Sequence, residues 1–520
     1  MKLFIGLDSS TQSLKALVVD AETGKITASA AVNFSSELPK YGCPNGVLPN
    51  KDPLVKHSNP LMWLEALDLA FSKLKDAKVP LNKVIGMSGS GQQHGSVYLN
   101  SKFKDILAGL DKAKPLADQI KPALSRKTSP IWMDSSTSAE CAEISKAIGA
   151  KKLQELTGSP AIERFTGPQI RKFFKTEPEN YKNTELIHLV SSFLASVLVG
   201  DSAPIDFGDG AGMNLLNLRT LLWDLKICEA TAPGLIEKLP QVTPANKVAG
   251  RLCPYFTKYG LKEGIPVLNW SGDNPSSLIG VGAGEPGTAV ISLGTSDTFF
   301  AAMTSSRIDP QGYGHVFGNP TGGFMSLICF KNGSLAREKV KDECGADWDA
   351  FEKAFSESKP GNGGNMMLPY FVPETTPLVL KEGAHFSGTP DFCKGRAPAA
   401  VMIRAVVESQ ILSMKLHSKW IGQDFKCIRV TGGASKSQGI CQIIADVFQA
   451  KVEKISVADS AALGAAVRVA QSVFFGRMTE YYAKFAAATE TIEPDKSTAA
   501  TYEKMLAKFA EFEKTQVGKL

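Results

Sequence analysis

Short apolar runs separated by polar turns recur along this chain, and one such unit occurs twice. Residues 3–7 and 14–19 are apolar runs on either side of a turn that is rich in hydroxyl side chains. The same arrangement returns 285 residues later, where residues 288–293 and 299–303 flank a Gly-Thr-Ser-Asp-Thr turn. Run, turn and run predict a β-hairpin in each place. A repeat at this spacing indicates two halves of similar design, with two unrelated hairpins as the alternative.

Strand-like and helix-like patterns alternate through the rest of both halves. In the first half, residues 63–74 and 185–199 are helix-like, and residues 84–88 are strand-like. The second half predicts a strand, a helix, a strand and an alanine-rich helix at 428–431, 437–448, 452–455 and 458–473. From residue 501 onwards, apolar side chains recur at helical spacing, which predicts an amphipathic helix that closes the core. This alternation is typical of an α/β fold.

Length and composition restrict the class of protein. At 520 residues the chain is too long for one hydrophobic core, and about 100–200 residues per domain gives roughly two to four domains. Apolar residues make up 43% of the chain and charged residues 21%, which excludes a fibrous or largely disordered protein. The net charge of +6 is spread thinly without a basic stripe, so we expect no nucleic-acid partner.

Cysteines and apolar stretches bear on the compartment. The nine cysteines lie far apart without a C-x-x-C pair, which is typical of free thiols in a reducing compartment. Residues 1–8 run straight into a strand pattern and leave no room for a signal peptide. The most apolar stretch, 186–200, is too short and too polar for a membrane span, so a buried helix is predicted there. We therefore expect a cytoplasmic protein without a membrane partner.

Two familiar nucleotide-binding motifs do not fit this sequence. The chain has no G-x-x-x-x-G-K-[ST] P-loop. Residues 282–287 match G-x-G-x-x-G, but they precede a strand and include a proline, so no helix can open there. Residues 89–95 follow a strand, and that loop is suited to presenting the side chains of Gln92, Gln93 and His94. The other histidines are interpreted as structural: His57, His188, His315, His385 and His417.

The two hydroxyl-rich turns are better candidates for phosphate binding. Backbone N–H groups and hydroxyls converge in such turns and can surround phosphate oxygens. The two turns offer Ser9, Ser10, Thr11 and Gln12, and Gly294, Thr295, Ser296 and Thr298. Asp8, at the end of the first strand, could hold Mg²⁺ through water, because Mg²⁺ keeps much of its hydration shell. Either turn alone is more often only a turn, so the prediction depends on the pair.

Three more segments carry candidate chemistry. A strand-to-helix joint at Gly432 and Gly433 would let the backbone approach a flat ring such as adenine, although it also suits an ordinary tight turn. Asp273 lies in a Gly/Pro turn, where aspartate often serves turn geometry alone. If buried, it could act as the base in phosphoryl transfer to a hydroxyl. Residues 132–136 and 163–166 mix aromatic and polar side chains and are weaker candidates for lining a sugar site.

Taken together, these segments resemble the FGGY family of carbohydrate kinases over nearly the whole chain. The pieces that carry the resemblance keep one order, at 5–12, 88–95, 131–137, 156–159, 163–167, 209–214, 271–275, 292–298, 431–435 and 461–464. Within the family, the Gln-Gln-His-Gly and Gly-Asp-Asn pieces point to the eukaryotic-type kinases of D-xylulose more than to glycerol kinase-like members.

The resemblance implies an α/β fold of two actin-like (ribonuclease H-like) ATPase domains with a catalytic cleft between them. The N-terminal domain, expected over residues 1–278, would carry the sugar site and the catalytic base. The C-terminal domain, expected over residues 279–520, would bind ATP and end in helices. Glycines cluster over residues 270–287, the expected joint between the domains, and residues 280–287 would form part of the hinge. Each predicted hairpin would face phosphate in its own domain.

The resemblance also assigns roles to single residues. Asp273 would be the general base that takes the proton of the sugar's terminal hydroxyl as this oxygen attacks the γ-phosphate. The sugar would contact Gln93, His94, Arg164, Asp273 and Asn274. ATP and Mg²⁺ would contact Asp8, Ser10, Thr11, Thr295, Ser296, Trp348, Gly432, Gly433 and Lys436. Among these, Lys436 lies where such kinases vary.

The expected activity is the ATP-dependent phosphorylation of D-xylulose to D-xylulose 5-phosphate. A kinase for another ketose or polyol is one alternative. A non-catalytic ATP-binding regulatory protein of the actin-like class is another. The expected partners are the sugar and ATP, bound by a monomer or a homodimer.

Overall fold

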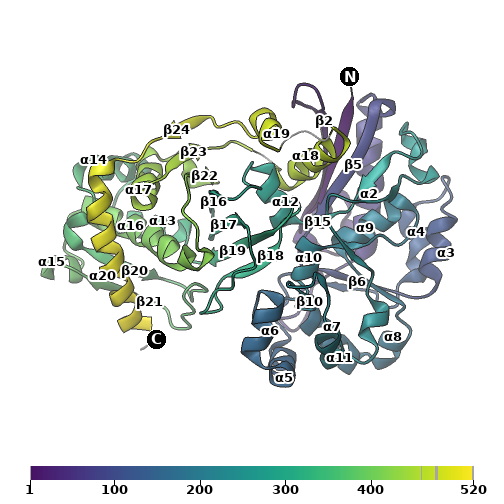
Figure 1. Ribbon diagram of the computed structural model, residues 1–520, viewed down its shortest axis with the longest axis horizontal. Helices are drawn as coiled ribbons and strands as arrows, with labels where there is room; N and C mark the ends of the chain where they lie inside the picture. The colour runs from purple at the N-terminus through teal and green to yellow at the C-terminus, as the bar shows by residue number, and fades with distance from the viewer. Residues whose placement is uncertain (1, 458, 475–477, 518–520) are drawn as a thin grey trace.

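The molecule has two lobes that lie side by side (Figure 1). The computed structural model describes residues 2–457, 459–474 and 478–517. One lobe is built mainly from the first half of the chain (purple to teal) and the other mainly from the second half (green to yellow). Each lobe contains a seven-stranded sheet. The two halves are therefore of similar design, as the repeated hairpin predicts.

The first sheet runs in the order β13-β14-β5-β1-β2-β3, and β15 also pairs with β5. Its strands are β1 (Leu3–Ser9), β2 (Ser13–Asp20), β3 (Ile26–Asn33), β5 (Val84–Gly91), β13 (Val248–Arg251), β14 (Pro266–Leu268) and β15 (Ser271–Gly272). β1 and β2 form the predicted hairpin, and β1 pairs in parallel with β5. Ser9 and Gly91 are partners at the ends of β1 and β5. This register brings the turn after β1 beside the loop after β5.

The second sheet runs in the order β18-β19-β17-β16-β22-β23-β24. Its strands are β16 (Thr288–Leu293), β17 (Asp297–Met303), β18 (His315–Gly318), β19 (Phe324–Phe330), β22 (Cys427–Thr431), β23 (Lys451–Lys454) and β24 (Glu490–Ile492). β16 and β17 form the second predicted hairpin, and β16 pairs in parallel with β22. A hairpin followed by a parallel neighbour is thus the plan of both sheets.

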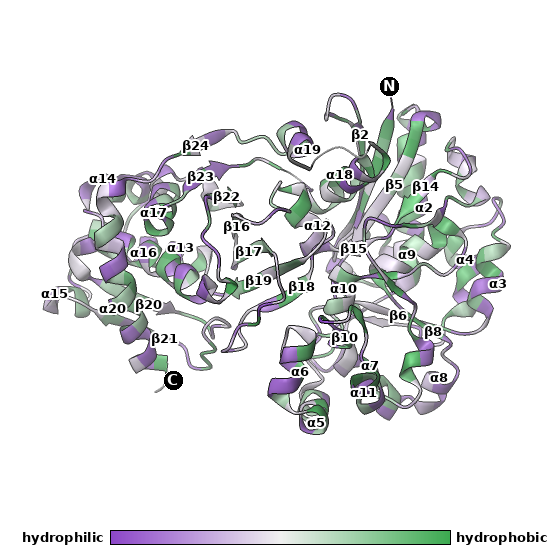
Figure 2. Ribbon diagram, in the orientation of Figure 1, coloured by the Kyte–Doolittle hydropathy of each residue, from purple (hydrophilic) through white to green (hydrophobic). Residues whose placement is uncertain are grey.

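Helices surround both sheets. In the first lobe the main ones are α2 (Pro60–Asp76), α5 (Ser138–Ile148), α6 (Ala150–Thr157), α7 (Thr166–Thr176), α9 (Val190–Val199), α10 (Phe207–Ala211), α11 (Leu225–Thr231) and α12 (Asp273–Gly280). In the second lobe they are α13 (Ser334–Glu343), α14 (Trp348–Glu357), α16 (Ala399–Ser418), α17 (Gln438–Phe448) and α20 (Ala499–Val517). Figure 2 shows hydrophobic residues gathered along the strands of the first sheet. Within the described ranges, no helix has the length and apolarity that a membrane span requires.

One helix prediction was wrong over its first residues. We expected a helix over 185–199, but β8 (Leu186–Leu189) precedes α9 and pairs with β6 (Ser96–Leu99). All four residues of β8 are buried. Periodicity cannot distinguish a short, fully buried apolar strand from the start of a buried helix. The partner strand, about 90 residues earlier in the sequence, determines the outcome.

Helix α18 (Ser460–Phe474) comes late in the chain but covers one face of the first sheet. Phe4 packs with α18, whereas its neighbour Ile5 belongs to the core on the opposite face, as expected for alternating strand positions. α18 also lies very close to α12. A Cβ on Gly464 would stand only 1.9 Å from the carbonyl oxygen of Ser276, so only glycine allows this approach. The residue predicted as the start of this helix, Ala458, lies outside the described residues.

Candidate active site

Asp273 is the first residue of α12 and directly follows β15. Backbone N–H groups of Gln93 and Asn274 donate to its Oδ1 at 3.4 and 2.9 Å, and the Asn274 side-chain amide donates at 3.2 Å. Burial raises the pKa of this carboxyl to about 6, although the hydrogen bonds act to lower it. The described hydrogen bonds all end on Oδ1, so Oδ2 is available to accept a proton. The pKa and the free oxygen suit a general base.

The loop after β5 places Gln93 beside Asp273. Oε1 of Gln93 accepts a hydrogen bond of 2.9 Å from Nδ2 of Asn274. The side chain of Gln93 lies over Gly272, where a Cβ would stand 2.3 Å from Cγ of Gln93. Its Nε2 is buried without a described partner, and a hydroxyl ligand would satisfy this donor. Three of the predicted sugar-binding residues therefore form one connected group.

His94 is buried behind the same loop. Its Nδ1 lies 2.8 Å from the carbonyl oxygen of Gly212, and a carbonyl only accepts, so Nδ1 carries the ring proton. Burial, helped by the charge of Arg164, lowers the pKa of His94 to about 3. The ring is therefore neutral near pH 7, and its Nε2 is a hydrogen-bond acceptor. An acceptor of this kind suits a sugar hydroxyl.

Arg164 lies close to His94 and is half-buried. Its charge acts to lower the pKa values of His94, His315 and Cys329. Its guanidinium is 5.9 Å from the ring centroid of Phe165. The fold thus brings the predicted sugar residue Arg164 to the same group as His94.

Asp8, near the end of β1, adds a second carboxyl. Its Oδ1 accepts a hydrogen bond of 2.7 Å from Ser90. Burial, followed by the neighbouring charge of Asp273, raises the pKa of Asp8 to about 7. Lys15, which forms an ion pair with Asp459, acts in the opposite direction. Lys15 and Asp459 are 444 residues apart in the sequence, so no local pattern predicts their ion pair.

The turn between β1 and β2 carries Ser10 and Thr11. Oγ of Ser10 donates to the carbonyl oxygen of Ser13 at 2.9 Å. Oγ1 of Thr11 accepts a hydrogen bond of 2.8 Å from the indole of Trp132. Both predicted residues are only partly buried, so a ligand can reach this turn.

The turn between β16 and β17 exposes Thr295 and Ser296. Directly after them, Asp297 forms a buried ion pair of 2.7 Å with Arg337 of α13. A Cβ on Gly333 would stand 2.7 Å from the carbonyl oxygen of Thr295, so the start of α13 packs closely on the turn. The start of α13 and its arginine thus hold the backbone, while the two predicted hydroxyls stay accessible.

Gly432 and Gly433 follow β22, which pairs with β16. The φ angle of Gly432 is 92°, and a Cβ there would lie 2.3 Å from a carbonyl oxygen of β16. A Cβ on Gly433 would meet nothing within 4 Å, so this backbone is open to a ligand. Trp348 begins α14 and is 53% exposed, with Nζ of Lys341 5.2 Å from its ring. Lys436 is also exposed.

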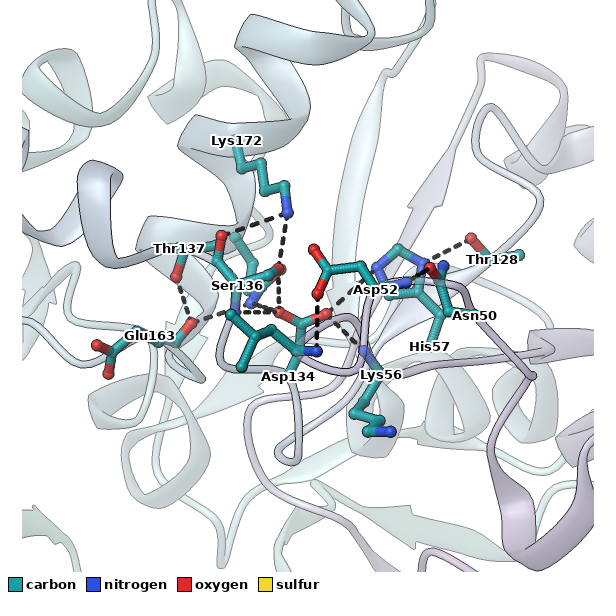
Figure 3. A network of polar contacts seen from close by, with 12 residues as sticks. Asn50, Asp52, Lys56, His57, Thr128, Asp134, Ser136, Thr137, Glu163 and Lys172 are labelled. Atoms are coloured by element: carbon teal, nitrogen blue, oxygen red, sulfur yellow. Dashed lines mark hydrogen bonds and ion pairs between the residues drawn. The ribbon is translucent and has the colours of Figure 1, made fainter.

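Asp134, one of the weaker sugar-site candidates, is occupied by a structural network (Figure 3). Its Oδ2 accepts from the backbone of Lys56 at 2.8 Å, and its Oδ1 accepts from Ser136 and Gln169. His57 lies 3.6 Å from Oδ2. Burial acts to raise the pKa of Asp134, but these hydrogen bonds lower it overall. Both oxygens already have partners, so the network fixes loops rather than a ligand.

A polar network behind Asp273 had little signal in the sequence. Arg468 of α18 donates to the carbonyl oxygens of Gly89 and Asn269, each at 2.9 Å. Asp206 accepts a hydrogen bond of 2.8 Å from Ser271 in β15. These contacts hold β5 and β15, the two strands that precede the loop with Gln93 and the start of α12. An arginine within an apolar helix was the one available indication.

Comparisons with known proteins define the family. The N-terminal domain of the FGGY family of carbohydrate kinases matches residues 3–280, and its C-terminal domain matches residues 289–472. Xylulose kinase 2 of Arabidopsis thaliana is 43% identical, over 90% of this chain and 87% of its own. A xylulose kinase of Rattus norvegicus is 39% identical, over 99% of this chain and 97% of its own.

Solved structures share the fold. A xylulose kinase from Rhodospirillum rubrum has a TM-score of 0.83 at 18% identity, over 99% of both chains. A xylulose kinase from Lactobacillus acidophilus has a TM-score of 0.81 at 20% identity, over 100% of both chains. These likenesses confirm the predicted two-domain α/β fold class. With both family domains matched in order, the chain belongs to the FGGY family of carbohydrate kinases.

Proposed function

We propose that this protein transfers the γ-phosphoryl group of ATP to D-xylulose and forms D-xylulose 5-phosphate. The observation that carries the proposal is Asp273, a carboxyl with a pKa raised to about 6, held through one oxygen and free at the other. The likeness to proteins named xylulose kinases over most of the chain supports the choice of sugar.

The reaction asks the protein chiefly for a base and for positioning. Oδ2 of Asp273 takes the proton of the sugar's terminal hydroxyl. The oxygen of this sugar hydroxyl then bonds to the γ-phosphorus, and the bond between the γ-phosphorus and the bridging oxygen breaks, so that ADP leaves. At about pH 7 a carboxyl of pKa about 6 is mostly ionised and is still basic enough to accept the proton.

Neighbouring side chains orient the sugar. Nε2 of His94 accepts a hydrogen bond from one sugar hydroxyl, and the guanidinium of Arg164 donates to a sugar oxygen. The free Nε2 of Gln93 donates to another sugar oxygen. Asn274 holds Gln93 and Asp273 in place through its side-chain amide.

We assign the sugar to the domain over residues 1–278 and ATP to the domain over residues 279–520. Thr295 and Ser296 offer exposed hydroxyls to the phosphates. Gly432 and Gly433 are exposed, and we assign adenine to their backbone, with the exposed Trp348 and Lys436 as further contacts of ATP. Ser10 and Thr11 approach the phosphates from the first lobe.

Asp8 is assigned to Mg²⁺, through water. A cation beside it would favour the ionised carboxylate, which burial and Asp273 now disfavour. Among the described residues no three carboxylate, histidine or cysteine side chains gather as ligands, which fits an ion that keeps its water. Bound Mg²⁺ neutralises phosphate charge in this class of reaction.

ADP release tests the function directly. The protein is given ATP and Mg²⁺ with D-xylulose, D-ribulose, L-xylulose, D-fructose or glycerol, and kcat/KM is compared. We expect D-xylulose to give the highest value. A higher value for another sugar would assign the protein to that ketose or polyol. ATP binding without sugar-dependent ADP release would instead favour a regulatory ATP-binding protein.

The setting of the protein is proposed as cytoplasmic, and the assembly as a monomer or homodimer. All nine cysteines are free, which supports a reducing compartment. The molar mass from light scattering during size-exclusion chromatography would distinguish a monomer from a homodimer. Localisation of a tagged full chain would test the compartment.

A further inference from the structure

His315 lies in β18 of the second lobe but contacts the first lobe. It is only 5% exposed, and its Nδ1 lies 3.2 Å from Oγ of Ser159. The next residue, Val316, donates its backbone N–H to the carbonyl oxygen of Gly158 at 3.1 Å. The start of β18 is therefore anchored on the segment that follows α6.

Neighbouring rings connect His315 with His94. Phe165 is fully buried, and its ring centroid is 5.6 Å from that of His315 and 4.4 Å from that of His94. The rings of His94 and Phe165 are stacked, with 22° between their planes. Phe317, also in β18, lies 6.0 Å from His315 and 6.5 Å from Phe165. The surroundings of Phe165, on which His94 rests, thus include rings from the second lobe.

His315 acts in this group without a charge. Burial lowers its pKa well below the ordinary value, and the nearby charge of Arg164 lowers it further. A neutral ring contributes through packing and through its hydrogen bond with Ser159. Aromatic pairs of this kind fix ring orientation as well as burying area.

We propose that His315 is a positioning residue for the sugar site: its ring holds Phe165, and Phe165 holds the ring of His94. Nε2 of His94 then stays where it can accept the sugar hydroxyl. The second lobe thereby completes a sugar site whose binding groups all lie on the first. This inference rests on the proposed function, because it assumes that His94 binds the sugar.

A double-mutant cycle on kcat/KM for D-xylulose tests the coupling. His315→Asn removes the ring but leaves a polar group for Ser159, whereas Ser159→Ala removes the hydrogen bond and leaves the ring. We expect His315→Asn to lower kcat/KM about tenfold, mainly through KM for the sugar, with KM for ATP unchanged. In a His94→Asn background the same change should cost less than about twofold. Ser159→Ala should have a small effect.

His417→Asn is the matched control, because His417 is another 5%-exposed histidine of the second lobe, bonded to Glu513. Its effect should be the same with and without His94→Asn. A tenfold loss for His315→Asn that persists in the His94→Asn background would overturn the proposal. So would a loss in KM for ATP as large as that for the sugar.

Imidazole ¹⁵N–¹H correlation spectra give a readout that needs no turnover. We expect the His94 signals, assigned from His94→Asn, to show one Nδ1–H tautomer in the wild-type protein. These signals should shift or broaden in His315→Asn but not in His417→Asn. Unchanged His94 signals would refute the positioning role. If the protein releases ADP with none of the sugars, the proposed function fails. These spectra still decide whether His315 orients His94.

Discussion

Asp273→Asn removes the proposed base while keeping its shape. The asparagine carbonyl oxygen can still accept the hydrogen bonds that Gln93 and Asn274 now donate to Oδ1. Its Nδ2 takes the place of Oδ2 but cannot accept a proton. We therefore expect KM for both substrates to change by less than about threefold, so the loss should fall on kcat.

The size of the loss follows from the role. A positioned general base contributes about 10²–10⁴-fold to the rate, so kcat should fall by this factor, or about 3–5 kcal/mol in the barrier. In the wild-type protein kcat/KM should rise as pH increases through about 6, because the base must be ionised. If Asp8 holds Mg²⁺ as proposed, saturating Mg²⁺ should keep this neighbouring carboxyl ionised during the measurement. The acid limb near pH 6 should be absent from the variant.

Stability gives an independent check of the same pKa. The folded-state pKa of Asp273 is about 6, above its ordinary value of 3.8. Between these values the folded protein keeps a proton that the unfolded chain has released, so stability falls as pH rises from about 4 to about 6. Asp273→Asn should match the wild-type Tm near pH 4 and exceed it near pH 8. Normal kcat in the Asp273→Asn variant, or an acid limb in its kcat/KM that persists near pH 6, would refute the role of Asp273 as the base.

Three further substitutions test other parts of the site. His94→Asn should raise KM for the sugar about tenfold or more and leave KM for ATP unchanged in steady-state kinetics. Arg337→Met leaves Asp297 buried without its ion-pair partner, and urea unfolding should show a loss of about 3–5 kcal/mol, partly recovered by adding Asp297→Asn. Gly464→Ala should lower stability by about 1–3 kcal/mol in urea unfolding despite the better helix propensity of alanine, because its Cβ would lie 1.9 Å from a carbonyl oxygen of α12. Gly109→Ala is the control: its Cβ would lie 3.5 Å from the carbonyl oxygen of Asp105, so this variant should lack the penalty.

Local sequence was enough for the parts of the fold that depend on neighbours along the chain. Both hairpins were predicted because an apolar run, a polar turn and a second run specify their own pairing. The loop with Gln93 and His94 was identified because it follows a strand and carries side chains where a nucleotide loop would carry glycine. In contrast, the apolar pattern of β8 predicts helix, and the strand forms through pairing with β6, whose residues are far away in the sequence.

The role of His315 shows the same limit for the site. In the sequence it is an isolated histidine within an apolar segment, for which a structural interpretation is reasonable. Only the packing of the two lobes places it 5.6 Å from Phe165. Side chains that act across a domain junction leave no spacing pattern, since their partners belong to unrelated segments.

Helix α18 explains how Asp8 and Asp273 come to share one site. A Cβ on Gly6 of β1 would stand 1.9 Å from the carbonyl oxygen of Ala462, so β1 touches the backbone of α18 two residues before Asp8. On the same helix, Gly464 makes the equally close approach to α12, which begins with Asp273. Both carboxyl-bearing elements therefore rest on one segment near the end of the chain. A methyl group at position 464 should shift α12 relative to β1, so Gly464→Ala is expected to lower kcat as well as stability.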